Sequence, residues 1–204
     1  MSDALKPQMN DRTAALGEPT DDEVIALTRS WLEHAVVGLN LCPFANAVLR
    51  KNQVAFRVSH AHNPETLWSD LLAAIEALLT TPAAETDTLL LIHPWTLTNF
   101  FEFNDFVGDA EALLEENGLA GILQLASFHP DYQFADAAAD DPTNHTNHAP
   151  YPTLHLLRED SLDQAIAALP DTDAVVERNL ATMRELGHDG WQALQARIRK
   201  DATR

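Results

Sequence analysis

The feature that most constrains the fold is an alternation of short apolar runs with amphipathic stretches. "NQVAFRVSHAH" alternates apolar and polar residues from Val54, and "PETLWSDLLAAIEALL" follows it with helical spacing. "DTLLLIHP" is a continuous apolar run, and "FNDFVGDAEALLEENG" follows it, again with helical spacing. Alternation predicts a half-buried strand, a continuous run predicts a strand buried on both faces, and apolar residues three or four apart predict a helix. The sequence therefore predicts two consecutive strand–helix units.

The segments on either side of these units complete the predicted order. "PTDDEVIALTRSWLEHAVVGLN" opens with Thr20 and Glu23 at capping-box spacing, and it predicts a helix that ends near Gly38. "LAGILQLASFHP" and "TLHLLRED" predict a third and a fourth strand with no helix between them. The helix "SLDQAIAALP" and two further helical segments, "DAVVERNLATMRELG" and "GWQALQARIRK", finish the chain.

This order predicts an α/β fold, with a mixed, mostly parallel four-stranded sheet flanked by helices in a layered arrangement. Helical connections favour right-handed crossovers between parallel strands, whereas the loop-joined fourth strand is expected to run antiparallel to its neighbour. The same element order occurs in thioredoxin-like folds. The 204 residues fit one domain. We expect a disordered N-terminal tail over residues 1–19, which are polar and aperiodic, and a single domain with C-terminal helices over residues 20–204.

Charge and composition exclude several classes of function. Lys plus Arg total 13 against 31 Asp plus Glu, which gives this acidic chain a formal net charge of −18 at pH 7. Such a charge repels phosphate backbones and anionic lipid headgroups, so we expect neither nucleic acid nor membrane as a partner. The sequence has no apolar run of about eighteen residues and no signal-peptide pattern, so a cytoplasmic location is expected. The single cysteine, Cys42, excludes an internal disulfide and a multi-thiolate zinc site.

Histidines follow each of the first three predicted strands. They are His60, His62, His93 and His129. Ligands of parallel sheets bind outside the carboxyl ends of the strands, where imidazoles can bind a metal or move protons near neutral pH. An ordinary loop position is the competing interpretation for the first three. His129 is favoured because Asp131 and Tyr132 follow it, and because it opens a connection of roughly twenty residues, a length that is usually functional or disordered.

The connection after His129 is rich in amides and rings. "TNHTNHAPYP" places Asn144 and Asn147 three residues apart and sets Tyr151 between two prolines. The two amides can donate and accept hydrogen bonds to a polar ligand, or they can tie the loop to itself through Asx-type turns. Both interpretations stay open at this point.

Two polar residues lie in the fourth predicted strand. His155 is on the strand face opposite Leu154, and it is either a substrate contact or a satisfied core histidine. Arg158 can hold a carboxylate or a phosphate bidentately, or it can pair with Glu159 or Asp160 in the following turn.

Cys42 stands in "GLNLCPFANAVLRKNQ", close to a predicted helix end and ahead of Arg50 and Lys51. Near the strand ends, imidazolium or cationic neighbours would stabilise its thiolate and make it a nucleophile or a redox thiol. A free cysteine is also a common small apolar filler of protein cores.

Four stretches together resemble a known family. "WLEHAVVGLNLCPFA", "ASFHPDYQFAD", "DDPTNHTNHAPYPTLHLLRE" and "ERNLATMRELG" are similar to the bacterial family catalogued as domain of unknown function 1415, over roughly residues 20–188. The resemblance implies a soluble bacterial protein and supplies no activity. The family pattern tends to carry Arg and Ser where this chain has His148 and Ala149, which argues against His148 as an obligatory metal ligand. The resemblance gives weight to these motif positions: Cys42, Pro43, Phe44, His129, Pro130, Tyr132, Phe134, Asn144, Asn147, Pro150, Tyr151, Pro152, His155 and Arg158.

Three functions follow as hypotheses. The first is an uncharacterised hydrolase or group transferase acting on a small polar or anionic molecule, with Cys42 as nucleophile or His129 as general acid/base oriented by Asp131. Its substrate would be bound by Tyr132, Asn144, Asn147, Tyr151, His155 and Arg158. The second is a metal-dependent enzyme with non-haem iron or zinc, because His129, Asp131 and the distal His155 resemble an iron-binding triad. It is disfavoured because such triads belong mainly to jelly-roll barrels. The third is a non-catalytic ligand- or partner-binding module. Cofactor, metal and oligomeric state stay open.

Overall fold

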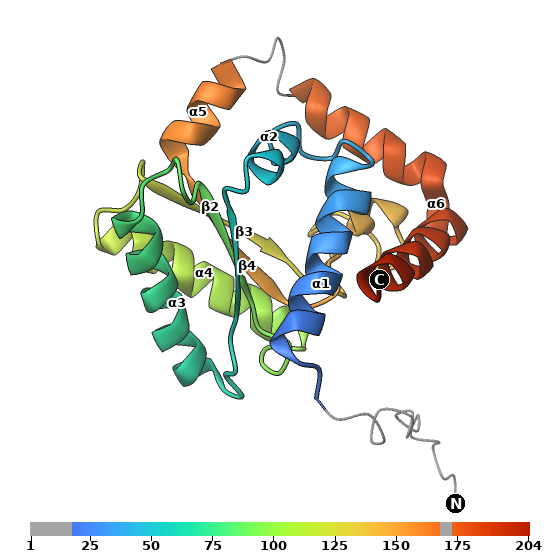
Figure 1. Ribbon diagram of the computed structural model, residues 1–204. Helices are drawn as coiled ribbons and strands as arrows, with labels where there is room; N and C mark the ends of the chain where they lie inside the picture. Colours follow the sequence, from blue (N-terminus) through green and yellow to red (C-terminus); the bar gives the residue numbers. More distant parts are fainter. Residues whose placement is uncertain (1–17, 168–172) are drawn as a thin grey trace, which may run out of the picture.

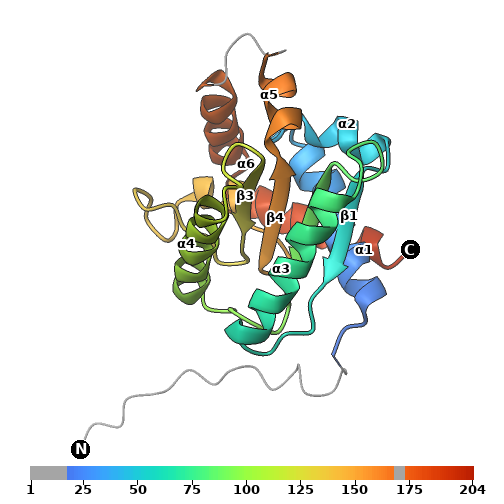
Figure 2. The ribbon, with the colours of Figure 1, turned by 90° about the vertical axis from the view of Figure 1, so that its left-hand side faces the viewer.

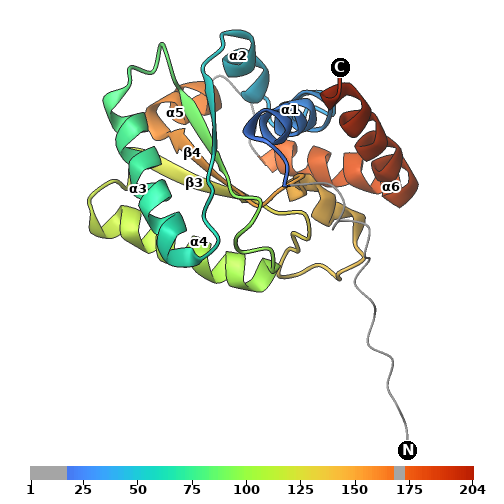
Figure 3. The same ribbon diagram turned by 60° about the horizontal axis from the view of Figure 1, so that its bottom comes forward.

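A computed structural model describes residues 18–167 and 173–204 and contains a four-stranded sheet between two layers of helices (Figure 1, Figure 3). The predicted α/β class and element order are confirmed. Most of the predicted tail, residues 1–19, lies outside the described residues. The elements in chain order are α1 (Asp21–Trp31), the π-helix η1 (Leu32–Val37), α2 (Ala45–Arg50), β1 (Val54–Val58), α3 (Pro64–Thr80), β2 (Thr88–Ile92), α4 (Phe100–Glu116), β3 (Leu123–Phe128), the 3-10 helix η2 (Pro142–Asn147), β4 (Thr153–Arg158), α5 (Glu159–Ala167) and α6 (Asp173–Ala202).

The sheet has the strand order β1-β2-β4-β3. The β1–β2 pair is parallel, whereas β4 runs antiparallel to both β2 and β3, so the prediction of a mostly parallel sheet is not confirmed. The physical reason is that β4 returns from β3 through a loop and inserts between β3 and β2, where Leu154 and Leu156 are fully buried. Because β4 runs antiparallel to both β2 and β3, those two strands point in the same direction. β1 points that way too, since it is parallel to β2. Their carboxyl ends share one edge of the sheet.

Local signals in the sequence set the helix starts. Thr20 and Glu23 form the predicted capping box at α1, and the side chain of Asn63 accepts from the N–H of Thr66 at the start of α3. Helix α4 begins at Phe100, three residues before the predicted start, because Asn99 caps it. Each such cap contributes about 1 kcal/mol.

The two predicted C-terminal helical segments together form α6. They meet at Gly187, whose φ of 60° and ψ of −175° break the helix. A residue with a side chain is strained at such a φ, so glycine permits the change of direction there. No helix among residues 18–167 and 173–204 is both long and apolar enough to cross a membrane.

The two faces of the sheet pack against different helices. Leu89 and Leu91 of β2 pack with the cluster that α3 and α4 cover, whereas Leu90 and Ile92 pack with the cluster that α1 and α6 cover. Figure 2 views the molecule from the side of α3 and α4, with the sheet behind them. Burial on both faces explains why β2 reads as a continuous apolar run. Each buried leucine contributes about 2 kcal/mol of hydrophobic free energy.

Candidate functional site

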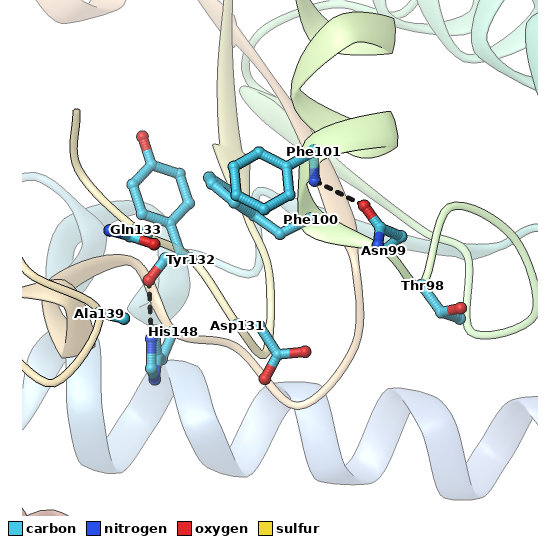
Figure 4. Close-up of a pocket in the computed structure, with 9 residues that line it drawn as sticks. All are labelled: Thr98, Asn99, Phe100, Phe101, Asp131, Tyr132, Gln133, Ala139 and His148. Carbon is cyan, nitrogen blue, oxygen red and sulfur yellow. Dashed lines mark hydrogen bonds between the residues drawn. The ribbon is translucent and has the colours of Figure 1, made fainter. Parts of the chain in front are cut away.

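A groove of about 410 Å³ lies at the carboxyl edge of the sheet (Figure 4). It opens between the N-terminus of α4 and the connection that joins β3 to η2, which is where a ligand is expected in a layered sheet. The residues that line it are Thr98, Asn99, Phe100, Phe101, Asp131, Tyr132, Gln133, Ala139 and His148.

One wall of the groove is the start of α4. Asn99 Oδ1 accepts hydrogen bonds from the N–H groups of Phe101, at 3.0 Å, and Glu102, at 3.2 Å. The partial positive charge of this helix terminus is therefore already met by an amide oxygen and by the Glu102 carboxylate.

Aromatic rings supply the apolar part of the groove. The ring centroids of Phe100 and Tyr132 are 5.0 Å apart, and the edge of Tyr132 meets Phe134 at 5.1 Å. Phe101 follows on α4 and is 69% exposed, the largest exposure among the exposed large apolar residues that the structure describes. These rings form the apolar wall of the groove, and most of the Phe101 side chain is open to solvent.

Asp131 supplies the negative charge of the groove. Its backbone N–H donates to His129 Nδ1 at 3.0 Å, which fixes the backbone of the residue, while the side chain stays exposed. No described residue donates a hydrogen bond to its carboxylate. The groove therefore contains an anchored but unpaired carboxylate.

His148 forms the part of the wall nearest η2. Its Nε2–H donates to the carbonyl oxygen of Tyr132 at 3.0 Å, as Figure 4 shows, and its Nδ1 lies 3.0 Å from Nδ1 of His145. Burial lowers the pKa of His148, and the hydrogen bond to Tyr132 and the charge of Asp131 oppose that shift. Because Nε2 donates to a carbonyl oxygen, the neutral form of His148 carries its hydrogen on Nε2 and none on Nδ1.

His129 is fully buried behind the groove and does not line it. Its Nδ1 accepts from the N–H of Asp131, so its proton is on Nε2, which donates to the carbonyl oxygen of Leu97 at 3.2 Å. Leu97 has a φ of 53°, an unusual conformation for leucine that this bond helps to hold. Burial lowers the pKa of His129, opposed by the Leu97 bond and by the Asp131 charge. His129 therefore ties two loops together, and Asp131 does not orient it through its carboxylate.

The two amides tie the loop to itself. Asn144 is buried, its Oδ1 accepts from the N–H of Phe134 at 3.0 Å, and its Nδ2 donates to the carbonyl oxygen of Ala138 at 2.8 Å. Asn147 donates to the carbonyl oxygen of Ser127 at 3.3 Å. Neither amide lines the groove. Both hold the connection to backbone groups, but their partners are too far away in the chain for the Asx-type turns that the sequence suggested.

Arg158 lies at the opposite end of β4 from the groove. Its guanidinium donates to the carbonyl oxygens of Leu78, Thr81 and Thr86, at the C-terminus of α3 and in the loop beyond it. A cation at a helix C-terminus stabilises the unpaired carbonyls and the helix dipole. The guanidinium of Arg158 therefore stabilises the fold. It does not pair with Glu159 or Asp160, and it does not reach the groove.

His155 and Tyr151 also lie outside the groove. His155 Nε2 contacts Thr88 Oγ1 at 2.5 Å, and that hydroxyl in turn donates to the carbonyl oxygen of Leu156 at 2.8 Å. Burial lowers the pKa of His155 to about 4. It is a neutral, hydrogen-bonded histidine of the sheet. Tyr151 packs against the cluster under α1 and α6, and burial raises the pKa of its phenol.

Cys42 does not line the groove. The chain runs from Cys42 through α2 into Val54, the first residue of β1, and Figure 3 shows α2 on the side opposite the N-terminus of α4. The neighbouring carbonyl oxygens of Asn40 and Leu41 accept hydrogen bonds from α6. Cys42 itself packs, partly buried, against the cluster under α1 and α6. The structure does not bring Cys42 and His129 together.

The other strand-end histidines form two separate groups at the carboxyl edge. His60 stacks on Trp95 with a centroid distance of 5.1 Å, and His62 packs against the same ring in a tilted arrangement at 6.0 Å. His93 is fully buried against Phe103, its Nδ1–H donates to the carbonyl oxygen of Thr96, and burial lowers its pKa to about 4. The predicted shared edge is present, but the imidazoles do not converge on one point.

The proposed H-x-D triad is not assembled in the structure. Both nitrogens of His129 are bonded to backbone groups, and His155 lies in the sheet with Thr88. Within the described part of the chain, no three His, Cys, Asp or Glu side chains are arranged to hold a metal ion.

Several groove residues lie in no motif that predicts a site. Thr98, Asn99, Phe100 and Phe101 come from the β2–α4 loop and the first turn of α4. The signal that could have found them is Asn99, a preferred N-cap residue placed before an apolar helical pattern. His148 had no such signal, because its place in the wall depends on η2.

The comparison with protein families gives a match over residues 23–193, to a family described as "Protein of unknown function (DUF1415)". The chain belongs to this family. The expected resemblance is therefore confirmed, and the DUF1415 match spans α1 to the second half of α6, including the whole groove. Neither the curated proteins nor the solved structures provide a match to the chain.

Proposed function

We propose that this DUF1415 chain binds a small organic cation, such as a primary or quaternary amine, in the groove at the carboxyl edge of the sheet. The observation that supports it most is the unpaired carboxylate of Asp131 in the same groove as Phe101, whose side chain is 69% exposed. An ammonium group gains from a carboxylate and from aromatic faces at the same time. The net charge of −18 would draw cations towards the protein and raise their association rate.

An anionic ligand fits the groove less well. The guanidinium of Arg158, which suggested an anion, is bonded to carbonyl oxygens at the C-terminus of α3. The N-terminus of α4 is capped by Asn99 and followed by Glu102. Asp131 and Glu102 would both repel a carboxylate or a phosphate placed there.

A hydrolase or group transferase acting on a small polar molecule is the second candidate. Asp131 and His148 line the same groove, and the charge of the carboxylate acts on the imidazole. In such an enzyme Asp131 would be the general base, because its carboxylate is exposed to the groove and has no described partner. Cys42 and His129 have no part in this version, because neither lines the groove.

The binding proposal can be tested without knowledge of the natural ligand. Tetramethylammonium, n-propylamine, acetate and inorganic phosphate would each be titrated into ¹⁵N-labelled protein. We expect the two ammonium probes to shift the amide signals of Phe101, Asp131 and Gln133. The variant D131N should weaken their binding about tenfold, which corresponds to about 1.4 kcal/mol.

Two matched variants serve as controls for this titration. D136N removes an exposed carboxylate from the same loop outside the groove, and C42S alters a thiol that does not line it; both should leave probe binding unchanged. Binding of acetate or phosphate in preference to the ammonium probes would overturn the proposal. So would equal binding by D131N and D136N.

The enzymatic candidate needs a separate measurement. Hydrolysis of p-nitrophenyl acetate and p-nitrophenyl phosphate would be followed for the wild type and for D131N and D136N. Catalysis by Asp131 requires a rate that D131N abolishes and D136N retains. Equal rates in all three proteins would exclude Asp131 as the base for these two substrates.

A further inference from the structure

Three imidazoles form a continuous chain from the groove wall to the surface of α6. His148, in the wall, faces His145 with their Nδ1 atoms 3.0 Å apart. His145 Nε2 lies 3.2 Å from Nδ1 of His188, which is exposed on α6. The outer nitrogens end on backbone carbonyl oxygens, His148 on Tyr132 at 3.0 Å and His188 on Asp140 at 2.9 Å.

The number of hydrogens on the three imidazoles determines how many of the four contacts can be hydrogen bonds at once. A carbonyl oxygen can only accept, so His148 Nε2 and His188 Nε2 must each carry a hydrogen. Each of the two nitrogen–nitrogen contacts needs one hydrogen, which brings the requirement to four. Three neutral imidazoles carry only three. All four contacts are hydrogen bonds only when the chain holds one extra proton.

The extra proton has the same complete bonding pattern at any of the three rings. When it is on His188, His145 carries its hydrogen on Nδ1 and His148 carries its hydrogen on Nε2. Transfer from His188 Nδ1 to His145 Nε2 breaks one N–H bond and forms another, and transfer from His145 Nδ1 to His148 Nδ1 repeats the exchange. Each state keeps four hydrogen bonds, so no ring has to turn.

The surroundings order these three states. Burial, followed by the charges of His148 and His188, lowers the pKa of His145 to about 4, so the middle ring is the least favourable place for the proton. The carboxylate of Asp131 acts on His148 at the inner end. At the outer end, hydrogen bonds from Thr143 lower the pKa of Asp141, and the charges of Arg184 and His188 add to that shift.

Trp191 holds the middle ring in line. It stacks on His145 with centroids 5.0 Å apart and planes 6° apart, so the ring of His145, in η2, packs against α6. A ring fixed in this way keeps both of its nitrogens directed at the neighbouring imidazoles, as transfer requires.

We propose that His148, His145 and His188 form a proton relay that holds one mobile proton and carries it between solvent and the groove wall. The groove then has a wall residue whose charge can change from neutral to positive next to Asp131. The relay depends only on the imidazole geometry, and it does not require the groove to bind an ammonium ligand.

Histidine side-chain NMR tests the relay in the intact protein. In the wild type, His148 and His188 should titrate with one shared midpoint, because a proton distributed over coupled sites has a single macroscopic transition. In H145Q the glutamine can bond to both neighbours but cannot pass a proton, and the two midpoints should separate by about one pH unit. H62Q, which changes an exposed histidine outside the chain, should leave the shared midpoint in place.

The tautomers provide a second readout that needs no substitution. At a pH below the shared midpoint, ¹⁵N–¹H couplings should place hydrogen on Nε2 of both His148 and His188, the two nitrogens that donate to carbonyl oxygens. Hydrogen on Nε2 of His145, with His188 doubly protonated, would overturn the relay. Different wild-type midpoints for His148 and His188, or a shared midpoint that survives in H145Q, would overturn it too.

Discussion

Two sets of polar side chains in this protein have opposite relations to the fold. The tying set consists of His129, Asn144, His155 and Arg158, and its side chains bond to backbone carbonyls, backbone N–H groups or, for His155, a buried hydroxyl. The groove set consists of Asp131 and Phe101, which both line the groove. Asp131 has no described partner for its carboxylate, and Phe101 is exposed.

The difference teaches how to distinguish a structural polar residue from a binding one. The two sets are close in the chain at one point, where His129 and Asp131 are only two residues apart. A buried polar atom must find a partner or cost about 1 to 3 kcal/mol, and in a loop the nearest partner is usually backbone. Side chains that satisfy this need are occupied. Those left over at the same edge are available to a ligand.

The largest expected effect is a fall in the free energy of unfolding at low pH, caused by the buried neutral histidines. His93 and His155 have folded pKa values of about 4 against an ordinary 6.5, so between these values the unfolded chain binds protons that the folded chain does not. Their contribution to stability is complete above about pH 6.5 and is lost as the pH falls through about 4. At about pH 4.5 each should cost about 2 to 3 kcal/mol of unfolding free energy, measured by urea denaturation.

Acid also protonates carboxylates and relieves the repulsion within a chain of charge −18, which acts in the opposite direction. The double variant H155L/T88V removes both partners of one contact and isolates the histidine part. Its stability should fall less than that of the wild type between about pH 7 and pH 4.5. If the double variant had the same pH dependence as the wild type, His155 would not be a buried neutral histidine that loses stability in acid.

Replacing His129 should be the most costly single substitution at this edge. H129A leaves a cavity and removes the bonds to the N–H of Asp131 and the carbonyl oxygen of Leu97. The unfolding free energy should fall by about 3 kcal/mol. The exposed H62A is the control and should change it by less than about 0.5 kcal/mol. Equal effects would show that His129 does not tie the loops.

Asn144 should have a smaller but still clear effect. N144A removes the hydrogen bonds to the N–H of Phe134 and the carbonyl oxygen of Ala138 inside a buried loop, at an expected cost of about 2 kcal/mol. N147A removes one side-chain bond of 3.3 Å and should cost less. If chemical denaturation gave the reverse order, the loop would be held differently from the contacts described above.

Replacing Arg158 should lower the stability of the protein without altering anion binding. R158M removes the bonds to the carbonyl oxygens at the C-terminus of α3, and we expect the unfolding free energy to fall by about 1 to 2 kcal/mol. R57M on β1 is the matched control. Phosphate titration should give the same weak response in R158M as in the wild type. A loss of phosphate binding would instead return Arg158 to the ligand site.

The smallest effect on stability is expected in the groove set. F101A truncates a ring that is 69% exposed, so the unfolding free energy should change by less than about 0.5 kcal/mol. Tetramethylammonium binding should nevertheless weaken, because a ring face for the cation is lost. I122A truncates another exposed apolar side chain outside the groove and should affect neither quantity. If F101A lost stability and kept normal binding, Phe101 would belong to the tying set and not to the groove set.

Much of the fold could be predicted because its signals are local. The capping box of Thr20 and Glu23, the cap at Asn63 and the apolar run of β2 all depend on residues close together in the chain. The carboxyl edge was also correctly identified as the place of the long polar connection. Of the predicted site residues, Asp131 and Tyr132 line the groove and the others do not, since residue type cannot reveal which atoms have already found partners.

The amino-acid sequence by itself determined the helices, the strands, the acid excess and the family, because periodicity, capping and motifs are properties of neighbouring residues. The tertiary structure alone decided the strand order, the bonding of Arg158 to Leu78 and the meeting of His145 with His188. Hydrogen-bond partners are set by distances in space between segments remote in the chain. For that reason only the folded arrangement separates the side chains that hold the protein together from those free to bind.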